Sequence, residues 1–129
     1  EALRIYGKEL GLAFQLIDDV LDYEGNAADL GKNVGDDLAE GKPTLPLIHA
    51  MAHADETGRK LVRQAIRKGG LDNMDEVMAV VTSTRSMEYT RSKANACVQR
   101  AEQQLQLLPQ SPAKDALIAL ARIAVQRKT

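Results

Sequence analysis

The sequence predicts an all-α fold. Of its 129 residues, 44% are hydrophobic and only 3% are aromatic, a balance that suits aliphatic helix packing better than a β-sandwich. No segment alternates polar and apolar residues as a half-buried strand does, whereas several segments place apolar residues at a helical spacing. The length is enough for one domain with a modest core.

The first element is a long helix over residues 2–23. Its apolar side chains recur at the helical period, and Gly7 and Gly11 are spaced for the close approach of another helix. Gly25 marks its end, because glycine readily adopts the left-handed backbone that closes a helix. A polar loop is predicted over residues 26–42.

Five further helices are predicted after the loop, and residues that start or stop helices mark some of their ends. Pro43 suits the first turn of one helix, and Asp72 is placed to cap another. Gly69 and Pro109 are placed to end helices. The predicted ranges are 43–53, 56–68, 73–84, 86–108 and 113–126.

The charge distribution excludes some classes of partner and points to one segment. The net charge is −1, so no overall field favours nucleic acid. Residues 18–42 contain eight acids and two lysines, whereas residues 43–129 contain thirteen basic and eight acidic residues. Cys97 is the single cysteine, which excludes an internal disulfide and agrees with a reducing compartment. No apolar run has the length of a transmembrane segment, and no signal-peptide pattern is present.

Three carboxylates, those of Asp18, Asp19 and Asp22, crowd one turn of the first helix. Asp18 and Asp22 are four residues apart and share a face, so together they suit a Mg²⁺ ion, which prefers oxygen ligands and substrate phosphates. Lys32 and Lys42, each preceded by glycine, follow in the loop and suit phosphate groups. A solvated acidic helix end followed by a charged loop is the alternative interpretation.

This arrangement resembles a known family. Residues 11–22 resemble the second aspartate-rich motif of the trans-polyprenyl diphosphate synthases, and residues 31–37 and 40–47 resemble the segments that follow it. The similarity is greatest to the bacterial long-chain, octaprenyl-type members. It implies Mg²⁺-dependent elongation of an allylic diphosphate, such as farnesyl diphosphate, with isopentenyl diphosphate to a long-chain diphosphate for quinone side chains.

The resemblance also implies a role for each site residue. Asp18 and Asp22 would face the metal, and Asp19 would support metal-bound water or a lysine. Arg127, near the end of the chain, is either a substrate contact or part of a frayed tail. The implied catalytic residues are Asp18, Asp19, Asp22 and Lys32, and the implied substrate-binding residues are Phe14, Gln15, Lys32, Asp37 and Lys42.

The family's first aspartate-rich motif is expected upstream of residue 1. Residues 1–129 are therefore expected to form the C-terminal half of the isoprenoid synthase helical bundle, and to be inactive alone. The full enzyme is expected to be a cytoplasmic homodimer whose product length the sequence does not give. The alternatives are a non-catalytic subunit or interaction module of a heteromeric synthase, and a class I terpene cyclase, although a cyclase is not expected to have the Gly-Lys loops.

Two other patterns are weaker. His49 and His53 are four residues apart on a predicted helix, but no third zinc ligand is evident, so a structural role is favoured. Arg59, Arg63 and Arg67 form a basic stripe that is either a solvated helix face or a contact with anionic lipid.

Overall fold

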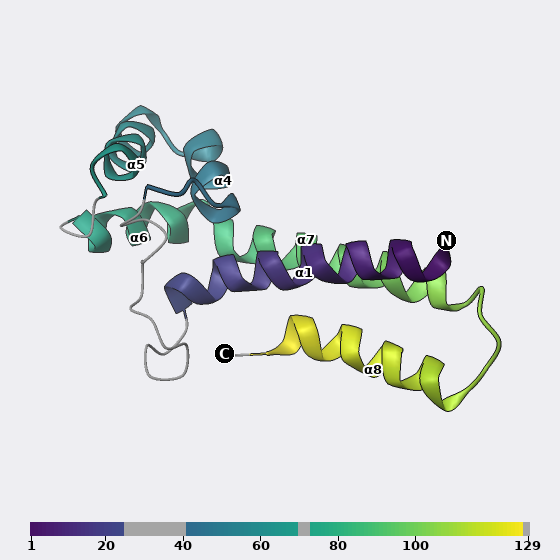
Figure 1. Ribbon diagram of the computed structural model, residues 1–129. Helices are drawn as coiled ribbons and strands as arrows, with labels where there is room; N and C mark the ends of the chain where they lie inside the picture. The colour runs from purple at the N-terminus through teal and green to yellow at the C-terminus, as the bar shows by residue number, and fades with distance from the viewer. Residues whose placement is uncertain (25–40, 70–72, 128–129) are drawn as a thin grey trace. The chain divides into compact units, whose positions relative to one another are not determined.

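The computed structural model describes residues 1–24, 41–69 and 73–127 (Figure 1). These ranges contain helices and connecting turns but no strand, which confirms the all-α prediction. The helices in these ranges are α1 (Ala2–Glu24), α4 (Leu45–His53), α5 (Glu56–Lys68), α6 (Met74–Ser83), α7 (Ser86–Leu105) and α8 (Pro112–Gln126).

The chain divides into two compact units. Of the described residues, the first unit comprises 1–18 and 91–127, and the second comprises 19–24, 41–69 and 73–90. The division falls inside two continuous helices, α1 and α7, each of which contributes to both units.

The first unit packs the beginning of α1, the later part of α7 and all of α8. The Tyr6 hydroxyl donates to the Leu117 carbonyl oxygen at 2.6 Å and so joins α1 to α8. Arg122 of α8 pairs with Glu102 of α7 at 2.9 Å. Small buried residues allow the helices to approach closely. They are Ala13, Ala94, Ala101, Ala121 and Ala124.

Gly7 and Gly11 do not mark a close helix contact in the described chain. Both are exposed, and a Cβ atom added at either would meet no atom within 4 Å. They lie on the outer side of α1, whereas Tyr6 and Ala13 are buried against the unit. The spacing of the two glycines therefore did not correspond to a close helix contact in this part of the fold. Spacing alone does not show which face of a helix another helix covers.

The second unit packs the end of α1 with α4, α5, α6 and the start of α7. Its core consists of buried aliphatic and aromatic side chains, and partly buried Met74 and Met78 pack against them. Burying a valine, leucine or methionine side chain contributes roughly 1.5–3 kcal/mol, and burying an alanine contributes less. The buried members are Val20, Tyr23, Leu47, Ala50, Val62, Ala65, Val77, Val81 and Met87.

Helix α5 has the bounds that the sequence predicts. The Asp55 carboxylate accepts a hydrogen bond from the Gly58 amide at 2.8 Å and caps the N-terminus. Gly69 closes the C-terminus with a φ of 65°, a left-handed conformation that favours glycine.

Two helix starts differ from the prediction. Helix α4 begins at Leu45, and the proline in its first turn is Pro46, not Pro43. Proline is tolerated there because the missing amide hydrogen would have no partner within the helix. Helix α6 has Asn73 at its N-cap position, where the Asn73 side chain makes no capping hydrogen bond. The predicted cap, Asp72, lies outside the described residues.

The end of α7 also differs. The helix ends at Leu105, three residues before the predicted end at Leu108. Residues 106–108 continue as tight turns in which each amide bonds the carbonyl oxygen three residues earlier, as helix ends often do. Helix α8 then begins after Ser111, whose hydroxyl accepts from the Lys114 amide at 3.1 Å.

None of the helices in the described ranges combines the length and apolarity needed to cross a membrane.

Candidate functional site

Asp18, the first aspartate of the acidic turn, lies on α1 in the first unit. Its side chain keeps 51% of its surface exposed, and it pairs with Arg127. The Arg127 Nη2 atom lies 2.5 Å from the Asp18 Oδ1 atom. The carboxylate that the sequence predicts as a metal ligand is therefore already in contact with a cationic group of the same chain.

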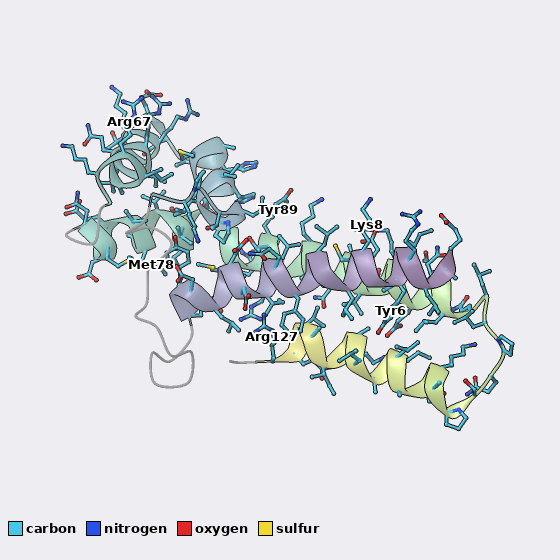
Figure 2. The ribbon with its side chains drawn as sticks, in the orientation of Figure 1. Tyr6, Lys8, Arg67, Met78, Tyr89 and Arg127 are labelled. Atoms are coloured by element: carbon cyan, nitrogen blue, oxygen red, sulfur yellow. The ribbon has the colours of Figure 1, made fainter. Side chains whose placement is uncertain are left out.

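Arg127 makes two further contacts with α1. It donates a hydrogen bond to the Phe14 carbonyl oxygen at 3.0 Å, and its guanidinium lies 4.0 Å from the centre of the Phe14 ring. Figure 2 shows Arg127 reaching from the end of α8 toward α1. The Arg127 side chain is only 15% exposed, so the described end of the chain is held against the acidic helix.

The position of Arg127 was not predictable from the sequence pattern. The residue is 109 positions from Asp18, and no local signal links two residues that far apart. The available signals were the positive charge of Arg127 and its position after an apolar helix. Both signals fitted a frayed tail as well as they fitted a substrate contact. The packing of α8 against α1 brings the two residues together.

Asp19 and Asp22 are in the second unit, and both are buried. Asp19 is 8% exposed and Asp22 is 0% exposed, although the two side chains are polar. A carboxylate in such a place stays charged only where cations or hydrogen-bond donors compensate it. Asp18 and Asp22 are one helical turn apart, as predicted, but only Asp18 is open to solvent in the described chain.

Lys42 follows a glycine whose backbone conformation is special. Gly41 has a φ of 76°, and a Cβ atom at this position would lie 3.1 Å from the Ile66 carbonyl oxygen. Glycine is therefore required both by the left-handed backbone and by the nearby α5 helix. Lys42 itself is exposed, just before α4. Two other predicted residues, Lys32 and Asp37, lie outside the described residues.

The remaining predicted substrate residues, Phe14 and Gln15, are exposed on α1. Phe14 keeps 42% of its surface exposed and supports the Arg127 guanidinium on its ring face. Cation–π contacts of this kind contribute about 0.5–1 kcal/mol at exposed sites. The structure thus joins Phe14 and Asp18 through one arginine.

The described residues contain no group of three or more histidine, cysteine, aspartate or glutamate side chains placed to hold a metal ion. Mg²⁺ does not need such a group, because it commonly uses one or two carboxylates with water and substrate phosphates. The Asp18 carboxylate fits that use, since it already attracts a cation and half of its surface reaches solvent.

The two histidines of α4 form a structural cluster. The Thr84 hydroxyl oxygen lies 2.9 Å from the Val80 carbonyl oxygen and 2.6 Å from the Ser86 hydroxyl oxygen. The Ser86 hydroxyl in turn shares a hydrogen bond of 2.7 Å with His49 Nδ1.

His49 also stacks between two rings. Its ring centre lies 4.3 Å from that of His53 and 4.2 Å from that of Tyr89. Burial and the neighbouring His53 both lower the pKa of His49 below its usual range. Stacked rings and a serine partner are features of a packed helix end, and no third metal ligand joins the pair among the described residues.

Comparisons with known proteins agree on one family. The family model described as polyprenyl synthetase matches residues 1–84, which include the acidic turn and the Gly41–Lys42 pair. The octaprenyl diphosphate synthase of Haemophilus influenzae is 52% identical over 128 residues, which are 98% of this chain and 39% of that protein. The octaprenyl diphosphate synthase of Escherichia coli is 49% identical over 128 residues, which are 98% of this chain and 40% of that protein.

A solved structure gives the same result. The polyprenyl synthase of Caulobacter crescentus, crystallised with calcium and isoprenyl diphosphate, matches with a TM-score of 0.90 and 39% identity. The match covers 100% of this chain and 40% of that one. The chain therefore spans about two fifths of the length of the relatives that it matches.

Proposed function

The chain belongs to the polyprenyl synthetase family, and on that premise we propose that it supplies the second aspartate-rich half of a trans-prenyltransferase. The reaction joins isopentenyl diphosphate to an allylic diphosphate such as farnesyl diphosphate. The observation that carries the proposal is the acidic turn followed by the Gly-Lys pairs, within a segment that the family model matches.

In this proposal the carboxylates of Asp18 and Asp22 hold Mg²⁺, whose charge would stabilise the departing diphosphate. Asp19 supports metal-bound water or a lysine. Support for a divalent cation comes from the Caulobacter relative, which was crystallised with calcium and isoprenyl diphosphate. Lys32 and Lys42 would hold the phosphate oxygens of the allylic substrate as point charges.

The remaining predicted residues complete this arrangement. Asp37 would orient its neighbours from outside the metal shell. Phe14 and Gln15 would line the junction of the two substrate sites, and their exposure on α1 leaves them accessible.

Arg127 adds a condition to this proposal. The Asp18 oxygen that contacts Arg127 cannot bind a metal ion at full strength while it accepts the guanidinium hydrogen. Metal binding therefore competes with this ion pair. In each state the Asp18 carboxylate has a cationic partner, which keeps its charge compensated.

The finer parts of the proposal rest on similarity. The octaprenyl synthases that share about half of their aligned residues with this chain support a long-chain product, which would serve as a quinone side chain. A cytoplasmic site and a homodimeric full enzyme are part of the same proposal. A non-catalytic subunit of a heteromeric synthase is the competing reading, and the intact Asp18–Asp22 turn argues against it.

Binding of a non-reactive farnesyl thiodiphosphate to the chain, measured by isothermal titration with and without Mg²⁺, tests the proposal. We expect binding that requires Mg²⁺ and that weakens by at least about tenfold in Asp18→Ala, because a charged ligand is lost. Asp75→Ala is the matched control, since Asp75 is an exposed aspartate in the first turn of α6. Equal binding by Asp18→Ala and the unchanged chain would favour the non-catalytic subunit.

A further inference from the structure

A groove of about 520 Å³ lies beside α4 and α5 in the second unit. Apolar residues from both helices line it, among them Ile48 and Ile66, and Ile48 keeps 46% of its surface exposed. Three arginines of α5 also line the groove, namely Arg59, Arg63 and Arg67. An aliphatic groove with a cationic edge is a surface for a ligand that is both apolar and anionic.

The three arginines are spaced four residues apart and so share one face of α5. Like charges at this spacing destabilise a helix by about 0.2–0.5 kcal/mol per pair, so the arrangement is unfavourable unless an anion compensates it. The helix carries five basic residues and one acid, which gives it a net charge of +4.

The described contacts leave two of the three arginines available. Arg59 is fixed, because its Nε atom donates to the Met51 carbonyl oxygen at 3.0 Å and it lies 3.5 Å from Glu56. Arg63 and Arg67 are exposed, and neither forms an ion pair with any residue in the described ranges. Arg67 is labelled on α5 in Figure 2.

We propose that this arginine groove docks the protein on the surface of an anionic phospholipid bilayer. Arg63 and Arg67 would meet lipid phosphates, and the exposed Ile48 would enter the boundary between headgroups and acyl chains. Charge complementarity identifies the anionic partner, and the aliphatic lining identifies its apolar part. None of the residues that line the groove is an aspartate of the proposed prenyl transfer, and its lipid binding does not depend on that activity.

Other anionic partners fit the groove less well. Single-stranded nucleic acid binds through aromatic side chains that stack on bases, and the residues lining this groove include no tyrosine, phenylalanine, tryptophan or histidine. A free phosphate ion would use the arginines but gain nothing from the aliphatic lining. An acidic protein segment is the remaining competitor, and the experiment includes it.

Cosedimentation with vesicles tests the proposal. Vesicles of equal parts phosphatidylcholine and phosphatidylglycerol are compared with vesicles of phosphatidylcholine alone. The test variant is Arg63→Gln with Arg67→Gln, and the matched control is Lys60→Gln with Lys68→Gln. The control removes two charges from the same helix at residues that do not line the groove. Circular dichroism verifies that each variant keeps its helix content.

We expect binding to the anionic vesicles only. The arginine variant should bind about thirtyfold more weakly, because each basic residue at such a surface contributes about a factor of five. The lysine control should change binding by less than about threefold, and Ile48→Ser should weaken it by about fivefold through lost apolar contact.

Four results would overturn the proposal. They are no binding to anionic vesicles, equal binding to both kinds of vesicle, equal losses in the arginine and lysine variants, and full binding by Ile48→Ser. Arginine-dependent binding of a polyglutamate peptide without vesicle binding would assign the groove to an acidic protein instead.

Discussion

Replacing Arg127 with glutamine should destabilise the first unit and release Asp18. Three contacts are lost together: the ion pair with Asp18 at 2.5 Å, the hydrogen bond to the Phe14 carbonyl oxygen at 3.0 Å, and the ring contact at 4.0 Å. Arg127 is only 15% exposed, so water replaces these contacts poorly.

The magnitude follows from the type of each contact. A hydrogen bond from a charged donor contributes about 1.5 kcal/mol. The ion pair contributes about 0.5–1 kcal/mol, because Asp18 is half exposed and solvent screens it. The contact with the Phe14 ring contributes about 0.5 kcal/mol. Since the three share one side chain, their contributions overlap, and we expect a total loss of about 1.5–2.5 kcal/mol in the free energy of unfolding.

Urea unfolding followed by circular dichroism measures this loss, and a double-mutant cycle isolates the ion pair. Arg127→Gln, Asp18→Asn and the double variant should give a coupling energy of about 0.5–1 kcal/mol. The coupling should decrease at high NaCl concentration, because salt screens exposed pairs. It should decrease further with Mg²⁺ and a diphosphate ligand at equal ionic strength, since the metal competes for Asp18.

A coupling energy below about 0.3 kcal/mol would refute the reasoning, because residues that do not interact are additive to within that range. A total loss below about 0.5 kcal/mol for Arg127→Gln would show that the end of α8 is not held by this side chain.

Two further predictions concern the second unit. Gly41→Ala should lower the free energy of unfolding, measured in urea, by about 1–2 kcal/mol. The φ of 76° is strained for alanine, and the alanine Cβ would lie 3.1 Å from the Ile66 carbonyl oxygen. An unchanged free energy of unfolding would contradict the left-handed backbone at Gly41. Stability should fall as the pH is lowered through the ordinary histidine pKa, because the lowered pKa of His49 keeps the folded ring neutral while the unfolded ring takes up a proton. Above the ordinary histidine pKa, the neutral His49 ring contributes its full stabilisation. His49→Asn should therefore flatten the dependence of the unfolding temperature on pH. Equal pH profiles for the variant and the unchanged protein would contradict this role of His49.

Local signals accounted for much of the fold. The end of α5 was predicted correctly because Gly69 acts on its own backbone neighbourhood. The capping role of Asp55 at the other end was not predicted. The end of α7 was placed three residues too late, because Pro109 excludes helix beyond it but does not prevent earlier residues from tightening into turns. Which glycines of α1 are covered depends on tertiary packing, and Gly7 and Gly11 proved exposed.

In the candidate site, too, local sequence signals predicted some features, whereas others depend on tertiary packing. The acidic turn and the Gly41–Lys42 pair are contiguous in sequence, so their residue types could be identified directly. The unequal exposure of Asp18 and Asp22 could not be predicted from the sequence, because it depends on which helices cover α1. The contact between Arg127 and Asp18 joins residues 109 positions apart, and only the packing of α8 brings it about.

The central claim is that the acidic turn of this chain serves prenyl transfer. The most direct test is a chimera in which this chain replaces the matching 128 residues of the Haemophilus influenzae synthase. The measurement is Mg²⁺-dependent incorporation of labelled isopentenyl diphosphate into farnesyl diphosphate, with product length read by chromatography. We predict a long-chain product, and a rate at least about a hundredfold lower for the Asp18→Ala chimera than for the Asp75→Ala chimera. A folded chimera that makes no product, or an Asp18→Ala chimera as active as its control, would contradict the claim.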